Sequence, residues 1–296
     1  MIRMAREIDS KLVKKIIPKR FAESHKGSYG NVLVLCGSKE MPGASRLVSR
    51  GAYAAGGGLV KSFAGENFAS FLKTDIPEVI VKEINESLFD TFSKDLYFDI
   101  ESEIGEKDII VFGCGVGQNL DLEEAAGDLV LNNKNTLIID GDGINLLKNN
   151  PELLLENKGE IILTPHPKEF SRISGYSVEY ILNNKEKTVA EFAKKYNVYL
   201  LLKGNGTIIS DPQGNLWINK TGNSALSKGG TGDVLSGIIA GFAAQGATPV
   251  ESMIIGAYLH GMAGEIASEE LTEYCVMATD LIKYLPQGIK KIQGDE

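Results

Sequence analysis

Ser227-Lys228-Gly229-Gly230-Thr231-Gly232-Asp233 is followed at once by Val234-Leu235-Ser236-Gly237-Ile238-Ile239-Ala240-Gly241-Phe242. In the second half of this stretch, apolar residues recur at the three- and four-residue spacing of a helix that buries one face. The glycines therefore open a helix, and the first N–H groups of a helix have no partner inside it. Because glycines let a ligand approach the backbone closely and the helix dipole attracts negative charge, the stretch predicts an anion-binding site.

Asp233 stands in the first turn of this helix, where its carboxylate would repel a bound phosphate. An acidic residue at such a position often does no more than complement the helix dipole. After Gly229, Gly230 and Gly232, however, we interpret Asp233 as a catalytic base that accepts the proton of a substrate hydroxyl beside a nucleotide phosphate. The short side chains between residues 237 and 244 predict that the helix packs closely on a neighbour.

The composition favours a single α/β domain that binds a small soluble ligand. The chain has 296 residues, 43% of them hydrophobic, and no Pro/Ser-rich linker, low-complexity tract or repeat divides it. The formal net charge of −8 argues against nucleic acid and membrane surfaces as partners. Cys36, Cys114 and Cys275 lie far apart, without the spacing of a zinc site or a disulfide framework, and the first residues lack the apolar core of a signal peptide. We therefore expect a cytoplasmic protein.

Alternating strand and helix patterns predict a three-layer fold with a mostly parallel sheet. Apolar runs typical of buried parallel strands occur at residues 31–36, 59–63, 79–81, 108–112, 136–140, 160–163 and 198–203. Asn205-Gly206 is a strong hairpin signal, so residues 207–210 and 216–219 are expected to form antiparallel strands at the sheet edge. Between about residues 83 and 107 the pattern is weak, and we expect a helix or an irregular cover there. Clear helical patterns occupy residues 8–17, 185–196, 249–270 and 278–284.

The chain is expected to begin with an N-terminal helical arm at residues 1–20, followed by one domain at residues 21–296. The helix at residues 8–17 is ended by Pro18 and has an apolar face. That face needs a partner surface, either on the domain itself or on a neighbouring subunit.

Loops at the ends of several predicted strands lie where open α/β sheets bind ligands. Pro42-Gly43-Ala44 precedes one helix. Gly113-Cys114-Gly115-Val116-Gly117-Gln118 matches a dinucleotide fingerprint only in part, because Gln118 replaces the third glycine, and we reject a Rossmann dehydrogenase. At the end of the run at residues 136–140, three polar side chains could bind a metal or a polar substrate, or cap the following helix, and we favour capping. They are Asp140, Asp142 and Asn145.

His166 and Lys203 are further candidates for the site. His166 lies between Pro165 and Pro167, which fix its backbone and suit a positioned imidazole better than a core histidine. Lys203 ends a predicted strand and could meet a nucleotide phosphate or be solvated, and the spacing does not decide between the two. His260 lies among apolar residues of a predicted helix, and we interpret it as a packing residue.

These motifs resemble the ribokinase-like superfamily and, within it, the ADP/ATP-dependent NAD(P)H-hydrate dehydratase family. The resemblance covers residues 21–284, and no G-x-x-x-x-G-K-[ST] segment of a P-loop NTPase is present. Asn223-Ser224-Ala225-Leu226 departs from the family, which more usually carries Asn-Pro-Gly-Met. The motifs that carry the resemblance are His25-Lys26-Gly27, Pro42-Gly43-Ala44, Asp140-Gly141-Asp142-Gly143-Ile144-Asn145, Thr164-Pro165-His166-Pro167-Lys168-Glu169-Phe170, Lys203-Gly204 and Gly229-Gly230-Thr231-Gly232-Asp233.

The resemblance implies a ribokinase-like α/β/α fold in which Asp233 is catalytic and the glycine loop stabilises the transferring phosphoryl group. It places the hydrated substrate against Ala44, Gly117, His166 and Asp233. It places the adenine nucleotide against Lys203, Gly204, Asn205, Gly206, Thr207, Gly229, Gly230, Thr231 and Gly232.

The reaction that the resemblance implies is the repair of hydrated NADH or NADPH. Hydroxide leaves poorly from the nicotinamide ring, so phosphorylation of the ring hydroxyl by ADP or ATP makes a group that the ring nitrogen can expel. Mg²⁺ is expected to offset the repulsion between Asp233 and phosphate, with ligands that the sequence leaves unknown. The loops decide neither between ADP and ATP nor between hydrated NADH and hydrated NADPH.

Partners and alternatives complete the expectations. Many bacterial relatives carry an epimerase domain ahead of the dehydratase, for which this chain has no room, so we expect a functional link to a separate NAD(P)H-hydrate epimerase. Relatives are commonly tetrameric, which implies a homo-oligomer. Two other functions stay open: a ribokinase-like kinase for a vitamin precursor such as hydroxyethylthiazole or hydroxymethylpyrimidine, and a non-catalytic adenine-nucleotide-binding module.

Overall fold

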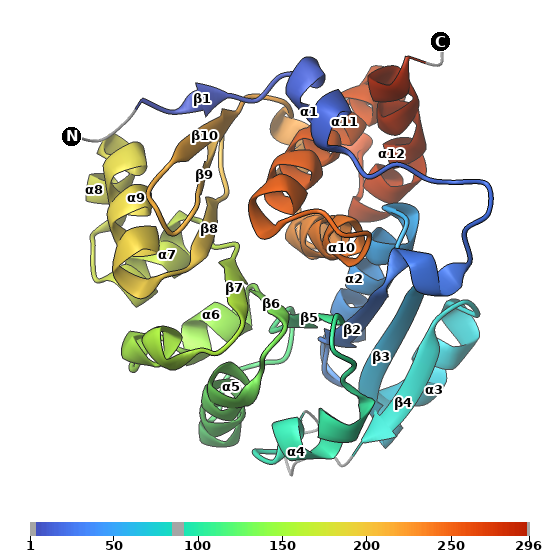
Figure 1. Cartoon of the computed structure of the whole chain (residues 1–296), viewed down its shortest axis with the longest axis vertical. Coiled ribbons are helices and arrows are strands. Elements are labelled where there is room, and N and C mark those ends of the chain that lie inside the picture. Colours follow the sequence, from blue (N-terminus) through green and yellow to red (C-terminus); the bar gives the residue numbers. More distant parts are fainter. Residues whose placement is uncertain (1–3, 85–91, 295–296) are drawn as a thin grey trace.

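A ten-stranded sheet forms the centre of the fold (Figure 1). The computed structural model describes residues 4–84 and 92–294. Strands β8 and β9, and β9 and β10, are antiparallel, whereas the other neighbouring pairs of this sheet are parallel. The predicted mostly parallel sheet with an antiparallel hairpin is therefore confirmed. In spatial order the strands are β1 (Arg6–Glu7), β10 (Leu216–Asn219), β9 (Thr207–Ser210), β8 (Tyr199–Leu202), β7 (Glu160–Leu163), β6 (Thr136–Ile139), β5 (Ile109–Phe112), β2 (Asn31–Leu35), β3 (Leu59–Gly65) and β4 (Ile80–Ile84).

Strand β1 extends the sheet beyond the predicted hairpin by pairing in parallel with β10. Helix α1 (Ser10–Ile16) follows, and its N-cap Asp9 accepts a hydrogen bond from the N–H of Leu12 at 2.8 Å. Ile8 and Val13 are buried in the larger hydrophobic core, against helices of the same chain. The apolar face of this segment thus finds a partner surface within its own chain.

Two layers of helices cover the two faces of the sheet, as the alternation along β2 requires (Figure 1). Val32 and Val34 face one core, and Leu33 and Leu35 face the other. The first face is covered by α2 (Pro42–Ala54), α3 (Glu66–Asp75), α10 (Thr231–Ala244), α11 (Pro249–Cys275) and α12 (Ala278–Gln293). The second is covered by α4 (Leu96–Ile100), α5 (Leu120–Asn132), α6 (Asp142–Leu146), α7 (Pro167–Ser174), α8 (Val178–Asn183) and α9 (Lys185–Tyr196). Short 3-10 turns are η1 (Lys26–Tyr29), η2 (Glu101–Glu103), η3 (Pro151–Glu156) and η4 (Ser224–Leu226).

Helix bounds differ locally from the sequence pattern. Helix α12 continues to Gln293, past the predicted end at residue 284. The region at residues 83–107, where we expected a helix or an irregular cover, contains α4 and η2 in agreement with that expectation, and its residues 85–91 lie outside the described part of the chain. None of the helices in the described residues combines the length and the apolar composition that crossing a bilayer requires.

Helix α10 packs on α2 almost backbone to backbone, as the short side chains predicted. A Cβ atom at Gly237 would lie 2.2 Å from the carbonyl oxygen of Val48, and one at Gly241 would lie 2.4 Å from that of Ala52. Helix α10 also contacts β2 and β5. This packing fixes the first turn of α10 beside the carboxyl ends of the parallel strands.

Candidate active site

The glycine loop and the first turn of α10 form the centre of the candidate site. Gly230 is the N-cap residue with a φ of 87°, a conformation that favours glycine. Thr231 holds the loop in place, because its hydroxyl donates to two carbonyls of the same loop at 2.9 Å each. His260, buried as expected of a packing residue, places Nε2 2.9 Å from the Thr231 carbonyl oxygen. In the described part of the chain, the N–H groups of Gly232 and Asp233 donate to no protein acceptor, which leaves them free for an anion.

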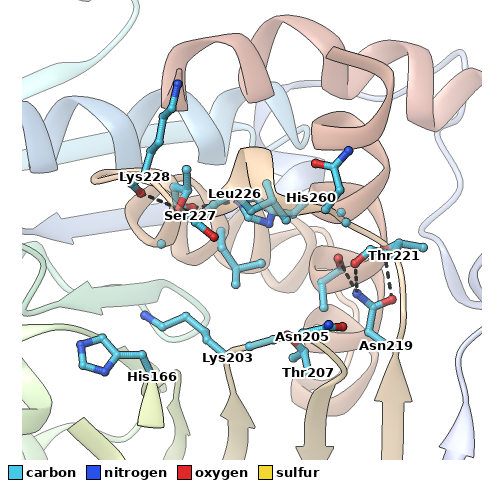
Figure 2. A pocket seen from close by; sticks show the side chains of 18 of the residues that line it. His166, Lys203, Asn205, Thr207, Asn219, Thr221, Leu226, Ser227, Lys228 and His260 are labelled. Atoms are coloured by element: carbon cyan, nitrogen blue, oxygen red, sulfur yellow. Dashed lines mark hydrogen bonds between the residues drawn. The ribbon is translucent and has the colours of Figure 1, made fainter. Parts of the chain in front are cut away.

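A cavity of about 770 Å³ opens beside this loop. In Figure 2 the Lys203 side chain extends toward the side where His166 lies, and Asn219 and Thr221 stand on the opposite side. Asn219 and Thr221, which the sequence analysis missed, belong to the edge hairpin and the segment after it. Of the predicted nucleotide residues, those that line this cavity are Lys203, Gly204, Asn205, Gly206, Thr207, Gly230, Thr231 and Gly232.

A smaller cavity of about 420 Å³ lies on the other side of Asp233. Ala44 and Gly229 line it, together with the loop after β5. Asp233 borders both cavities, whereas His166 borders only the larger one. Gly117 lines neither, and its N–H group donates to the carboxylate of Asp142 at 3.0 Å. The structure therefore brings Ala44 and Asp233 together at the smaller cavity, and it does not bring Gly117 to either cavity.

Lys203 and Asp140 form an ion pair beneath the glycine loop. Lys203 Nζ lies 2.6 Å from Asp140 Oδ1, and the Asp140 side chain is only 2% exposed. Ser236 donates its hydroxyl to the other carboxylate oxygen at 2.7 Å. Burial by itself would lower the pKa of Lys203. The Asp140 and Glu169 carboxylates have a larger combined effect and raise the pKa above its usual value. The ammonium group also lies against the loop, because a Cβ atom at Gly232 would be 3.2 Å from Nζ.

The expectation that Asp140, Asp142 and Asn145 cap the following helix was wrong. The N-cap residue of α6 is a glycine, and no side chain caps the helix start. Asp140 pairs with lysine, Asp142 binds the loop after β5, and Asn145 Oδ1 accepts from Arg172 at 2.9 Å. Neighbouring parallel strands bring these partners together, and bonds to charged groups are stronger than a bond to a helix N–H.

His166 is held in one orientation by the start of α7. Its Nδ1 accepts the N–H groups of Lys168 and Glu169 at 3.1 and 3.2 Å, so Nε2 carries the proton of the neutral ring. That Nε2 lies 3.2 Å from Glu169 Oε1. Burial, aided by Lys203, lowers the pKa of His166.

Glu169 is a further carboxylate of the site that the sequence analysis missed. Its side chain is buried, and burial raises its pKa to about 7 although Lys203 opposes the shift. Its Oε2 accepts the backbone N–H of His166 at 2.8 Å, so the two residues form a reciprocal capping box. The His-x-x-Glu spacing was the signal that could have identified it.

Asp233 has the electrostatic properties of a general base. Burial raises the pKa of its carboxyl to about 7, and the Asp140 carboxylate adds to the rise while Lys203 opposes it. A base with a pKa near the working pH is well suited to proton transfer. Cys114, Asp140 and Asp233 have ligand atoms within 4.8 Å of one another. A hydrogen bond with Cys36, together with burial, raises the pKa of the Cys114 thiol, so this neighbour is a neutral group at pH 7.

Comparison with known proteins agrees with this geometry. Residues 32–287 match the family model described as NAD(P)H-hydrate dehydratase. An ADP-dependent (S)-NAD(P)H-hydrate dehydratase of Bacillus subtilis is 34% identical over 281 residues, which are 95% of this chain and 96% of that protein. The bifunctional NAD(P)H-hydrate repair enzyme Nnr of Moorella thermoacetica is 33% identical over 94% of this chain, but the chain spans only 53% of that protein.

A solved structure gives the same result for the fold. The crystal structure of ADP/ATP-dependent NAD(P)H-hydrate dehydratase from Bacillus subtilis, co-crystallised with ATP and Mg²⁺, has a TM-score of 0.82 and 31% sequence identity to this chain. The match covers 97% of this chain and 99% of that one. The resemblance inferred from the motifs is thus confirmed along nearly the whole sequence, and the chain belongs to the NAD(P)H-hydrate dehydratase family.

Proposed function

We propose that this chain dehydrates the (S) form of hydrated NADH or NADPH back to NADH or NADPH, with ADP or ATP as the phosphoryl donor. The observation that supports this most is the position of Asp233, a carboxylate with a pKa of about 7 that borders two cavities and adjoins free N–H groups. The name of the Bacillus subtilis relative supports the substrate class and the nucleotide.

The two cavities suggest where each substrate binds. The larger one suits the nucleotide, with its terminal phosphate at the N–H groups of Gly232 and Asp233. The smaller one suits the hydrated nicotinamide ring, beside Ala44. Glu169 and Asp233 line both cavities, so a hydroxyl from one side and a phosphoryl group from the other can meet there. We place His166 at this boundary because of its contact with Glu169.

The residues then support a two-step reaction. Asp233 takes the proton of the ring hydroxyl, the oxygen forms a bond to the terminal phosphorus, and the bond from that phosphorus to the rest of the nucleotide breaks. The shortened nucleotide leaves with the bonding pair. In the second step, the lone pair of the ring nitrogen expels phosphate with the electrons of its C–O bond. Loss of a proton from the adjacent ring carbon then restores the double bond.

Within residues 4–84 and 92–294, the side chains do not form a cage for Mg²⁺. Cys114, Asp140 and Asp233 are the cluster whose ligand atoms lie near one another. Yet a thiol is a poor ligand for Mg²⁺, and both oxygens of Asp140 already bind Lys203 and Ser236. We therefore assign Mg²⁺ no ligand among the residues that the structure describes, and we expect the ion to bind together with the nucleotide phosphates.

One assay with hydrated NADH and ADP or ATP tests the proposal. A dehydratase restores the near-ultraviolet absorbance of reduced nicotinamide and releases free phosphate, a vitamin-precursor kinase leaves a stable phosphoester on its own substrate, and a non-catalytic module turns nothing over. We expect restoration, and a loss of roughly 10²–10⁴-fold in Asp233→Asn, the usual contribution of a general base. Glu124→Gln, a change of an exposed carboxylate on α5, is the matched control. Full activity of Asp233→Asn would remove Asp233 from the mechanism.

The wider setting remains part of the proposal. The bifunctional names of several relatives support a functional link to an NAD(P)H-hydrate epimerase. Three free cysteines, two of them buried, suit the reducing cytoplasm. Assembly into a homotetramer and the division into an arm at residues 1–20 and a domain at residues 21–296 are likewise proposals.

A further inference from the structure

The charged residues of the larger cavity leave a polyanionic nucleotide short of positive partners. Its lining contains three carboxylates and two lysines, and these are Asp140, Glu169, Asp233, Lys203 and Lys228. Lys203 is already engaged, at 2.6 Å from Asp140 and 4.0 Å from Glu169. Its charge therefore compensates the protein's own carboxylates before it can serve a ligand. Lys228 is the other lysine that lines this cavity, and it takes no part in the reaction proposed above.

Lys228 stands at the entrance to the anion-binding loop. It directly precedes Gly229, where a Cβ atom would have no heavy atom within 4 Å, so this side of the loop is open. Its side chain is exposed, and no carboxylate of the described residues forms an ion pair with it. Its ammonium group instead donates to the backbone carbonyl of Tyr274. Figure 2 shows this side chain pointing away from the part of the cavity where Lys203 and His166 lie.

The contact with Tyr274 is one that the protein can give up. Thr272 has φ 65° and ψ 154°, which interrupts α11, and Tyr274 follows this break with a side chain that is 91% exposed. A carbonyl at an exposed helix end can accept a hydrogen bond from water in place of the lysine. The long flexible stem of lysine lets its ammonium group turn from one partner to another.

We propose that Lys228 is a mobile phosphate-binding residue, which leaves the Tyr274 carbonyl and pairs with the terminal phosphate of bound ADP or ATP. This inference rests on the proposed function and adds to it a named partner for the nucleotide. The terminal phosphate is the specific target because Lys228 adjoins the loop whose free N–H groups lie next to Asp233. A phosphate that stops one unit short of this loop, as in AMP, lies beyond its reach.

A purely structural role for Lys228 makes different predictions. Lysine near a helix C-terminus can bind the last carbonyls and interact favourably with the helix dipole. In that case its replacement would lower the melting temperature without nucleotide and leave nucleotide affinity unchanged. Glutamine, which can still donate to a carbonyl, would then substitute for it.

Calorimetric titration of AMP, ADP and ATP into the full chain separates these roles. For Lys228→Ala and Lys228→Gln we expect the Kd of ADP and ATP to rise about tenfold, the range for one hydrogen bond to a charged group. The Kd of AMP should change less than about threefold, and Lys228→Arg should stay close to wild type. Lys73→Ala, which removes an equal charge from an exposed ion pair on α3, is the matched control and should bind like wild type.

The outcomes of the titration test the role of Lys228 separately from the proposed dehydratase function. Wild-type affinity for ADP in Lys228→Ala, equal losses for AMP and ADP, or recovery by Lys228→Gln would each overturn the role of Lys228 while leaving the proposed function standing. A wild-type chain that binds neither ADP nor ATP would overturn both. Melting temperatures without nucleotide check that the variants fold, and we expect them to agree with wild type within about 2 °C because Lys228 is exposed.

Discussion

The substitution Asp233→Asn should stabilise the protein, and by an amount that grows with pH. Burial raises the pKa of this carboxyl from 3.8 to about 7 in the folded chain. Below pH 3.8 the group is protonated in both the folded and the unfolded chain. As the pH rises from there to about 7, the unfolded chain releases the proton and the folded chain keeps it, so the free energy of unfolding falls. Asparagine has the same shape and no charge, and it avoids this loss.

The magnitude follows from the two pKa values. Each unit of difference corresponds to about 1.36 kcal/mol, so the advantage of asparagine is about 2 kcal/mol at pH 5 and about 4 kcal/mol at pH 8. Asp233 borders two cavities, and water there screens part of the effect. We therefore expect the advantage to increase by ~1 to ~3 kcal/mol between the two pH values, or roughly 2–6 °C in melting temperature for a chain of this size.

Thermal and urea unfolding at pH 5 and pH 8 measure this difference directly. Glu124→Gln, at an exposed site on α5, should change stability equally at both pH values. The reasoning would be refuted if Asp233→Asn were no more stabilising at pH 8 than at pH 5. Such a result would mean that burial does not disfavour the ionised form of the Asp233 carboxyl. Its assignment as a base with a pKa near neutrality would then be wrong.

Three further outcomes are expected. The kcat/KM of the wild type should rise with pH up to about 7 and then level off, because only ionised Asp233 can accept a proton. Activity at pH 6 should be roughly tenfold lower than at pH 8. A profile that is flat over this range would exclude Asp233 as the base. Lys203→Met leaves the buried Asp140 carboxylate without its partner and should cost about 3–5 kcal/mol in urea unfolding, whereas Lys73→Met, in an exposed ion pair, should cost at most about 1 kcal/mol. Gly237→Ala places a Cβ atom 2.2 Å from a backbone oxygen of α2 and should cost at least about 1–3 kcal/mol, while Gly43→Ala, where a Cβ atom has open space, should be tolerated.

The parts of the fold that were predictable are those with a long local pattern. The parallel strands β2, β3 and β5 to β8 follow from apolar runs, because a strand buried on both faces favours apolar side chains along most of its length. Strand β4 lies at the sheet edge with partly exposed residues, and it spans Ile80–Ile84 where the apolar pattern predicted only residues 79–81. Strand β1 has only two residues, and its place depends on pairing with β10, so no local pattern could reveal it. The predicted end of α12 at residue 284 was too early. Pro286 lies inside the helix, although proline usually ends one, and the buried Leu285 and Ile292 hold the helix to the core.

The candidate site likewise has one part that a local sequence pattern predicts and another part that depends on contacts between distant residues. The glycine loop and Asp233 are adjacent in sequence, so a short motif was enough to propose an anion-binding site and a catalytic base there. The partners that set the charge of Asp233 come from other strands. Asp140 and Lys203 lie 63 residues apart and meet only because β6, β7 and β8 are neighbours in the sheet. Sequence spacing left Lys203 undecided between phosphate and solvent, since the answer required the order of the strands.

The ion pair between Asp140 and Lys203 helps to keep Asp233, the proposed base, partly ionised at neutral pH. Asp140 raises the pKa of Asp233 and Lys203 lowers it, while burial acts in the same direction as Asp140. Without the lysine, burial and the second carboxylate would favour the protonated acid, which cannot accept a proton. Without Asp140, the ammonium group would pair with Asp233 and make it a weaker base. Because each partner holds the other at 2.6 Å, the cavity keeps both effects in balance. Lys203 is then committed to the protein's own carboxylates, and this is the physical reason for which we propose Lys228 as a second cation for the nucleotide at the loop.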